Sequence, residues 1–411
     1  MTESTAEPSE RWRILAVLAT GTLLAMAPWL TGAAVAPALR VEWALSSSQL
    51  PLLTVAVQLG FAAGAITLAA LGAPDVLPAR RLFLWGALLA AMTNMAFAFL
   101  ARDLASGLVL RFATGASLAA VYPVAMKLTV GWFRAERGLA VGVLIGALTV
   151  GTALPYLFTG LGALAGSDWR LVVAAASPIA VVGGLLVAAR TRPGPFDVPA
   201  PRFSPRLALA ALREPAVRLA NLGYLGHMWE LYAMWAWIPL FLAASFTAAG
   251  APSSGATSSA FVVIATGAIG CVAAGALADR FGRTTLTIGA MAISGLSAVA
   301  AGWLFGASPL LVVAVCLIWG VSIVADSAQF SSAVTELAPP GTAGSALSLQ
   351  VALGFTLTGV TILGVGALAL DDASAWRSAF TLLAIGPAVG IVAMWRLRGR
   401  PEAVRMASGR R

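Results

Sequence analysis

Long apolar stretches alternate with short polar ones along almost all of this 411-residue chain. Most of these stretches are about 20 residues or longer, which as a helix is enough to cross a bilayer core of about 30 Å. The pattern therefore predicts twelve membrane-spanning helices. These cover residues 14–39, 49–71, 82–101, 106–130, 139–163, 169–189, 217–245, 256–278, 284–305, 309–333, 344–370 and 376–395.

Composition supports this interpretation, because 59% of the residues are hydrophobic and only 10% are charged, which excludes an ordinary soluble domain. The net charge of +9 is distributed unevenly between the two sides that the spans define. Twenty arginines fall on the side of the two termini, and four fall on the other side, namely Arg40, Arg102, Arg170 and Arg377. Because basic residues are retained on the inner side, we expect cytoplasmic termini in a plasma or inner membrane and no nucleic-acid partner.

The chain is predicted to contain one six-helix unit used twice. Trp169-Arg170 opens the sixth span and Trp376-Arg377 opens the twelfth, 207 positions later, and Asp75 precedes Asp279 by 204 positions. The longest basic interval, between Arg190 and Arg218, contains six arginines and several prolines, as expected of a linker between halves. The predicted parts are a cytoplasmic tail (1–13), a first bundle (14–189), a cytoplasmic linker (190–216), a second bundle (217–396) and a cytoplasmic tail (397–411).

One short loop gives the chain a family resemblance. Residues 275–283 read Gly-Ala-Leu-Ala-Asp-Arg-Phe-Gly-Arg, and their spacing resembles the signature loop of the major facilitator superfamily. The resemblance implies an all-α integral membrane transporter, with twelve helices in two pseudo-symmetric six-helix bundles, and not an enzyme. The alternative is an ordinary glycine-rich turn with positive-inside charges.

The resemblance also implies a conformational latch on the cytoplasmic side. Asp279 would lie near the positive N-terminal end of a helix in the opposite half, and neighbouring arginines would pair with loop acids such as Glu136. The residues assigned to this latch are Gly275, Asp279, Arg280, Gly282, Arg283, Asp75, Glu136 and Arg137.

In this family the first, fourth, seventh and tenth spans line a central cavity, and in this chain the fourth, seventh and tenth of these carry candidate polar residues. Ionisable groups inside the hydrocarbon cost at least a few kcal/mol each, so we expect them to mark a pathway. The candidate residues of a substrate and proton pathway are Arg111, Lys127, His227, Glu230, Asp326 and Gln329.

Each candidate has a structural alternative. Arg111 faces either the cavity or the membrane interface, and Lys127 either reaches the cytoplasm or contacts substrate. His227 and Glu230 share one helix face, so they either carry a proton or pair with each other or with Arg111. Asp326 has no arginine in its own helix, so its partner must be another helix, a proton or a solute.

These observations predict a secondary active transporter that moves a small polar or anionic organic solute by alternating access, coupled to protons. The alternative is proton-coupled export of drugs or metabolites, although the fifth span lacks the Gly-Pro pair of antiporters in the family. The expected partners are a small-molecule substrate, protons and the lipid bilayer. We also expect a monomer. No redox role, metal or cofactor is expected, because Cys271 and Cys316 lie in apolar runs and no metal-ligand spacing is present.

Overall fold

The computed structural model describes residues 9–164, 168–198, 202–369 and 375–410, and the described chain is almost entirely helical. Eleven of its helical segments are long and apolar enough to cross a membrane. The first predicted span is divided among three shorter helices, because the chain turns at residues 26–30. The first six spans are formed by α1 (Arg11–Ala25), α2 (Thr31–Ala34) and α3 (Ala36–Glu42), by α4 (Leu52–Leu71), by α6 (Ala79–Leu100), by α7 (Leu104–Leu118) and α8 (Tyr122–Val130), by α9 (Arg137–Leu164), and by α10 (Trp169–Arg190).

The second half of the chain repeats this arrangement. Short elements lie between the spans, namely α5 (Ala73–Val76), α11 (Pro205–Arg213) and η1 (Ser253–Gly255), and η3 (Pro401–Gly409) follows the last span. The last six spans are formed by α12 (Pro215–Ala248), by α13 (Ala256–Ala265) and α14 (Gly267–Phe281), by α15 (Arg283–Trp303), by α16 (Pro309–Ile323) and α17 (Ser327–Leu337), by α18 (Ala343–Ala369), and by α19 (Trp376–Leu383) and α20 (Ile385–Arg398).

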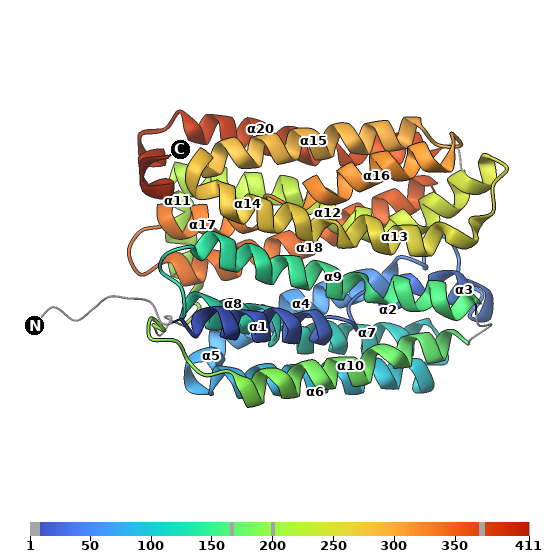
Figure 1. Cartoon of the computed structure of the whole chain (residues 1–411), viewed down its shortest axis with the longest axis horizontal. Coiled ribbons are helices and arrows are strands. Elements are labelled where there is room, and N and C mark those ends of the chain that lie inside the picture. The colour runs from blue at the N-terminus through green and yellow to red at the C-terminus, as the bar shows by residue number, and fades with distance from the viewer. Residues whose placement is uncertain (1–8, 165–167, 199–201, 370–374, 411) are drawn as a thin grey trace, which may run out of the picture.

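The spans run roughly along one axis, with the first-half helices on one side of the molecule and the second-half helices on the other (Figure 1). Helix α1 begins, and η3 ends, at the same end of the bundle (Figure 1). We call this end the terminal face and the other end the opposite face. The two halves meet where α9 packs against α13 and α14, and where α4 packs against α18.

Glycines allow the closest of these contacts between the halves. A Cβ atom added at Gly142 on α9 would lie 2.4 Å from the carbonyl oxygen of Cys271 on α14. One added at Gly275 would lie 2.4 Å from the carbonyl oxygen of Gly138. Only a residue without a side chain fits at these positions, so Gly275 of the signature loop is a contact point between the two halves.

Interruptions in the fourth and tenth spans repeat with the spacing of the sequence. The fourth span breaks at residues 119–121 and the tenth at residues 324–326, which is a separation of 324 − 119 = 205 positions. This interval agrees with the sequence repeats of 204 and 207 positions. Broken helices inside a membrane protein place backbone polar groups and cap residues in the interior, where solute and ion sites are found.

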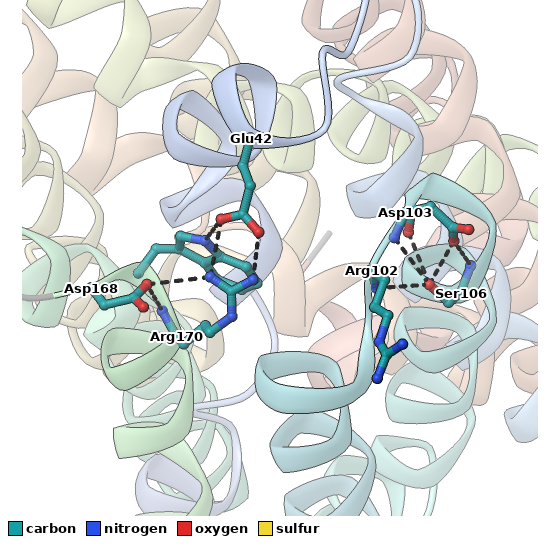
Figure 2. Close-up of polar contacts among 7 residues, drawn as sticks. Glu42, Arg102, Asp103, Ser106, Asp168 and Arg170 are labelled. Carbon is teal, nitrogen blue, oxygen red and sulfur yellow. Dashed lines mark hydrogen bonds and ion pairs between the residues drawn. The ribbon is translucent and has the colours of Figure 1, made fainter.

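Hydrogen bonds fix two helix ends at the opposite face (Figure 2). Asp103 precedes α7, and its carboxylate accepts from the N–H of Ser106 at 2.8 Å, while Ser106 Oγ accepts from the N–H of Asp103. The hydrogen bonds from the side chain and backbone of Ser106 hold the pKa of Asp103 below its ordinary value. Nearby, Glu42 at the end of α3 accepts from Arg170 at 3.0 Å and from the indole N–H of Trp169 at 2.6 Å, which ties α3 to α10.

Candidate functional site

A row of polar side chains runs through the second bundle from its middle toward the terminal face. Its innermost member is Glu230 on α12, whose side chain is almost completely buried. One carboxylate oxygen accepts from the indole N–H of Trp319 at 2.7 Å, and the other accepts from Ser294 Oγ at 2.9 Å. These donors come from α16 and α15, so Glu230 joins three helices.

One turn closer to the terminal face, His227 meets Asp326. His227 Nδ1 lies 2.8 Å from Asp326 Oδ1, and the two side chains are only 1% and 2% exposed. The rings of Tyr224 and Phe330 pack against the imidazole. Asp326 occupies the break of the tenth span, immediately before α17. Of the three partners considered for Asp326, namely another helix, a proton or a solute, the structure shows a contact with another helix, α12.

Gln329 and Glu336 continue the row along α17. Both are joined by Arg283 at the start of α15, which donates to Gln329 Oε1 at 2.7 Å and to the two oxygens of Glu336 at 2.6 and 2.8 Å. Glu336 also accepts from the backbone N–H of Ala407 in η3 at 3.2 Å. The row thus connects buried Glu230 with the chain end at the terminal face.

Arg111 is completely buried in the first bundle and directs its guanidinium at the break in the first span. It donates to the carbonyl oxygens of Pro28, at 3.1 Å, and Trp29, and to the side chains of Thr31, at 2.9 Å, and Asn94, at 3.3 Å. Its partners are therefore uncharged groups of its own bundle. The possibility that Glu230 or His227 pairs with Arg111 does not match these contacts.

Lys127 shares no hydrogen-bond or ion-pair partner with Arg111 among the contacts given for the described residues. Its amino group forms an ion pair with Asp75 and lies 4.0 Å from Asp197, and its side chain is 19% exposed. Asp75 belongs to α5, between the second and third spans, and Asp197 follows α10. Lys127 therefore connects two segments of the terminal face to the end of α8.

The residues of the predicted latch have several different partners. Glu136 accepts from Arg11 of its own bundle at 2.7 Å, which corrects the expected pairing with arginines of the 275–283 loop. Arg137 lies within electrostatic reach of Glu336 and Arg283 across the boundary between the halves.

The predicted loop at 275–283 is mostly helical, because α14 continues to Phe281 and α15 begins at Arg283. Gly282 makes the turn between them with a φ of 86°, and the Arg280 guanidinium lies over the ring of Phe281. The side chain of Asp279 lies outside the described part of the structure, so its predicted partner stays a prediction.

Sequence reasoning missed an aromatic cluster at the boundary between the two halves. Trp29 and Phe61 of the first half meet Tyr232 and Phe355 of the second, with ring centroids 4.5 to 5.8 Å apart. Trp235 joins them, 5.1 Å from Tyr232. Aromatic residues in several spans are the only signal in the sequence, and their positions do not show which of them meet.

Unsatisfied polar atoms lie in and beside this cluster. Gln58 is three residues before Phe61 on α4, and its amide oxygen and nitrogen are both buried without a hydrogen-bond partner in the described protein. The indole nitrogens of Trp29 and Trp235 are also buried without a hydrogen-bond partner in the described protein. Buried polar groups are normally paired, so such a group of atoms at a boundary between bundles is typical of a binding site.

A cavity of about 240 Å³ lies between the halves. It is closer to the opposite face than the aromatic cluster is. Ala33 and Ala34, four and five residues after Trp29, form one wall, and Pro239 and Leu240, four and five residues after Trp235, form another. The cavity is thus about one helical turn from the aromatic cluster.

Comparison with known proteins identifies the family. The model of the Major Facilitator Superfamily matches residues 17–360. The chain belongs to the major facilitator superfamily. The predicted membership is confirmed, and the protein is a multi-pass membrane transporter and not an enzyme.

Solved structures of major facilitator proteins have the same fold. The proton:xylose symporter XylE bound to 6-bromo-6-deoxy-D-glucose superposes with a TM-score of 0.71 at 17% identity, over 95% of this chain and 96% of XylE. A partially occluded inward-open XylE from E. coli gives 0.73 at 15%, over 94% and 99%. An inward-facing bacterial homologue of the lysosomal transporter Spinster gives 0.69 at 18%, over 96% and 100%. At these identities the likeness shows the fold alone.

A curated relative within the superfamily is the MFS-type transporter pytF of Aspergillus terreus. It is 32% identical over 161 residues, which are 37% of this chain and 50% of the relative. The match therefore spans half the length of that protein.

Proposed function

We propose that this major facilitator protein is a proton-coupled secondary transporter of a small polar organic solute, moved by alternating access. The observation that carries the proposal is the buried row that starts at Glu230 and passes through His227 and Asp326 toward Glu336. A carboxylate and an imidazole inside a membrane span are costly, and they are typical of proton and ion pathways.

Protons would reach Glu230 along this row. His227 precedes Glu230 by three residues and Gln329 follows Asp326 by three, so successive groups are about one turn, or 5 Å, apart. The second nitrogen of His227, Nε2, is buried without a hydrogen-bond partner in the described chain, which leaves it able to take up a proton or contact a solute. Arg283, which holds Gln329 and Glu336, would close the row at the terminal face.

The solute would bind at the aromatic cluster, where both halves contribute contacts. Gln58 can both donate and accept, and the indole N–H groups of Trp29 and Trp235 can donate. Aromatic walls with a few neutral hydrogen-bonding groups favour a neutral or weakly charged polar solute. An anionic solute is less favoured, because the two terminal nitrogens of Arg111 are engaged by uncharged groups of the first and third spans, while its Nε is buried without a hydrogen-bond partner in the described chain.

We further propose that the terminal face is cytoplasmic, with the protein in a plasma or inner membrane as a monomer. Residues 14–189 and 217–396 would be its two moving bundles. The loop at 275–283 would latch the cytoplasmic side through Asp279, Arg280, Arg283 and Arg137. Replacement of Asp279 by Asn would then raise the accessibility of a cysteine near the terminal face of the central cavity a few-fold.

Transport in proteoliposomes tests the function. D-xylose is the first solute to try, because a proton:xylose symporter shares the fold, and a panel of other small polar metabolites follows. We expect an inward proton gradient to accumulate one of these solutes, and Glu230→Gln to reduce that accumulation at least ten-fold. Gln can still accept from Trp319 and bond Ser294, so folding should be preserved.

Three results would contradict parts of the proposal. Uptake insensitive to pH would make the protein a uniporter. Full transport activity of Glu230→Gln would show that the row of polar side chains from Glu230 to Glu336 does not carry the protons. Proton-driven extrusion of a lipophilic cationic dye such as ethidium, without movement of small polar metabolites, would establish the alternative of drug or metabolite export.

A further inference from the structure

The terminal ends of α12 and α20 form a groove that the transport pathway does not use. These helices pack side by side, and the groove between their ends has a volume of about 440 Å³. It is lined by Pro215, Arg218, Leu219, Leu222, Arg396 and Arg400. The four residues of α12 have the spacing of one helix face, at positions i, i+3, i+4 and i+7.

The three arginines of this groove form no ion pair with any acid in the described part of the chain. The acids closest to them in sequence are Glu214 and Glu402, and neither lies within 4.0 Å of these guanidinium nitrogens. Some other arginines at the terminal face are paired with acids, as Arg11 is with Glu136 and Arg283 with Glu336. Three cations converging on one groove without a carboxylate therefore favour an anionic ligand. Phosphate suits them, because guanidinium groups can bind its oxygens in a bidentate manner.

Exposed apolar residues place this groove at the surface of the bilayer. Leu222 is 44% exposed and Val392 is 48% exposed, on helices that cross the membrane, so both face acyl chains. Trp395 is 68% exposed, and tryptophan at the end of a span marks the headgroup region. Arg218 lies four residues, or about 6 Å, beyond Leu222 toward the terminal face. The guanidiniums are therefore level with headgroups, and the leucines are level with acyl chains.

We propose that this groove is a binding site for an anionic phospholipid, with the phosphate held by Arg218, Arg396 and Arg400 and an acyl chain lying along Leu219 and Leu222. Basic pockets between membrane helices at the cytoplasmic side recognise such headgroups. The apolar part of the groove, formed by Leu219 and Leu222, favours binding of a lipid over binding of a soluble phosphate. Because the site joins α12 to α20, a bound lipid would stabilise the terminal end of the second bundle.

Lipid titration of the purified full chain in detergent tests this site by native mass spectrometry and thermal shift. We expect phosphatidylglycerol to bind and raise the melting temperature, with phosphatidylcholine much weaker. Each arginine contributes roughly a five-fold change in affinity, so the triple variant R218Q/R396Q/R400Q should bind phosphatidylglycerol about 100-fold more weakly. Arg218 and Arg396 are exposed and Arg400 is partly exposed, so the variant should fold, and its melting temperature without lipid checks this.

Arg398→Gln is the matched control, because Arg398 lies at the same end of α20 but donates to Thr285 instead of lining the groove. It should bind phosphatidylglycerol like the wild type. Unchanged binding by the triple variant would overturn the proposal, and so would an equal loss in the control. Displacement of the lipid by millimolar inorganic phosphate would show a soluble-anion site instead. None of these measurements depends on transport, so the result is separate from the proposed function.

Discussion

The guanidinium of Arg111 donates to the carbonyl oxygen of Trp29 and thereby fastens the fourth span to the break in the first. Sequence reasoning treated Arg111 as a solute anchor or an interfacial cation. Its contacts instead satisfy carbonyl groups that the break removes from the helical hydrogen-bond ladder. Because Trp29 belongs to the aromatic cluster, Arg111 positions a wall of the proposed solute site.

Replacement of Arg111 by Lys should therefore reduce stability as well as transport. A lysine cannot reach both carbonyl oxygens and the side chains of Thr31 and Asn94, and leaving such buried groups unpaired costs about 3 kcal/mol in total. We expect the melting temperature to fall by several degrees. Arg102→Lys, at an exposed position near the start of the same span, should leave it unchanged. A variant at Arg111 with normal stability that loses only solute affinity would favour direct binding of an anion.

A second prediction concerns Asp326 in the break of the tenth span. Asp326→Asn keeps the size of the side chain but removes the carboxylate beside His227. We expect solute accumulation driven by a proton gradient to fall at least ten-fold, because no charge remains to bind and release the proton at this step. Facilitated equilibration of the solute without a gradient should persist.

Ser322→Ala supplies the control, because Ser322 lies near the end of α16, four residues before Asp326, and hydrogen-bonds only carbonyl groups of its own helix in the described structure. Its accumulation ratio should match the wild type. Normal gradient-driven accumulation by Asp326→Asn would mean that the pair with His227 is a structural tie.

The sequence predicted the architecture well because membrane spans depend on local hydrophobicity, which can be read along the chain. It also identified Glu230, His227 and Asp326 as candidates, because charged residues in apolar runs are conspicuous. It could not predict their partners, since those depend on how the helices rotate and pack. Trp319 is 89 positions from Glu230, and its indole N–H carries no signal in the sequence.

Glu336 at the terminal face supports a third prediction. Its carboxylate binds Arg283 and also the backbone N–H of Ala407 in η3. Glu336→Gln weakens both contacts, and at a partly exposed site the loss is about 1 kcal/mol. The undocked population of η3 should then rise about five-fold, and trypsin cleavage at Arg405 should accelerate by the same factor. Thr335→Ala, at the neighbouring exposed position, should leave the cleavage rate unchanged. Equal cleavage rates for the wild type, Glu336→Gln and Thr335→Ala would show that Glu336 does not hold η3 in place.

The last prediction concerns Glu42 at the opposite face, where pH acts on an exposed contact. The Arg170 guanidinium, and then the Trp169 indole N–H, hold the pKa of Glu42 below its ordinary value of 4.5 (Figure 2). A carboxyl group whose pKa is lowered by folding stabilises the protein above its ordinary pKa, and that stabilisation is lost as the pH falls through the lowered value. Because the side chains of Glu42 and Arg170 are both about a third exposed, this ion pair contributes at most about 1 kcal/mol to the stability of the protein.

We therefore expect the wild type to melt slightly above Glu42→Gln at pH 7, with a difference that disappears below pH 4. Asp103→Asn is the comparison, because Asp103 also has a lowered pKa but caps α7 without contact to α10. Asp103→Asn should show a similar pH dependence of its melting temperature. Only Glu42→Gln should loosen α3, which would be seen as faster hydrogen exchange of the α3 amides. A melting difference for Glu42→Gln that stays constant from pH 7 to pH 3 would show that α3 is held by Trp169 and packing, without a contribution from the carboxylate charge.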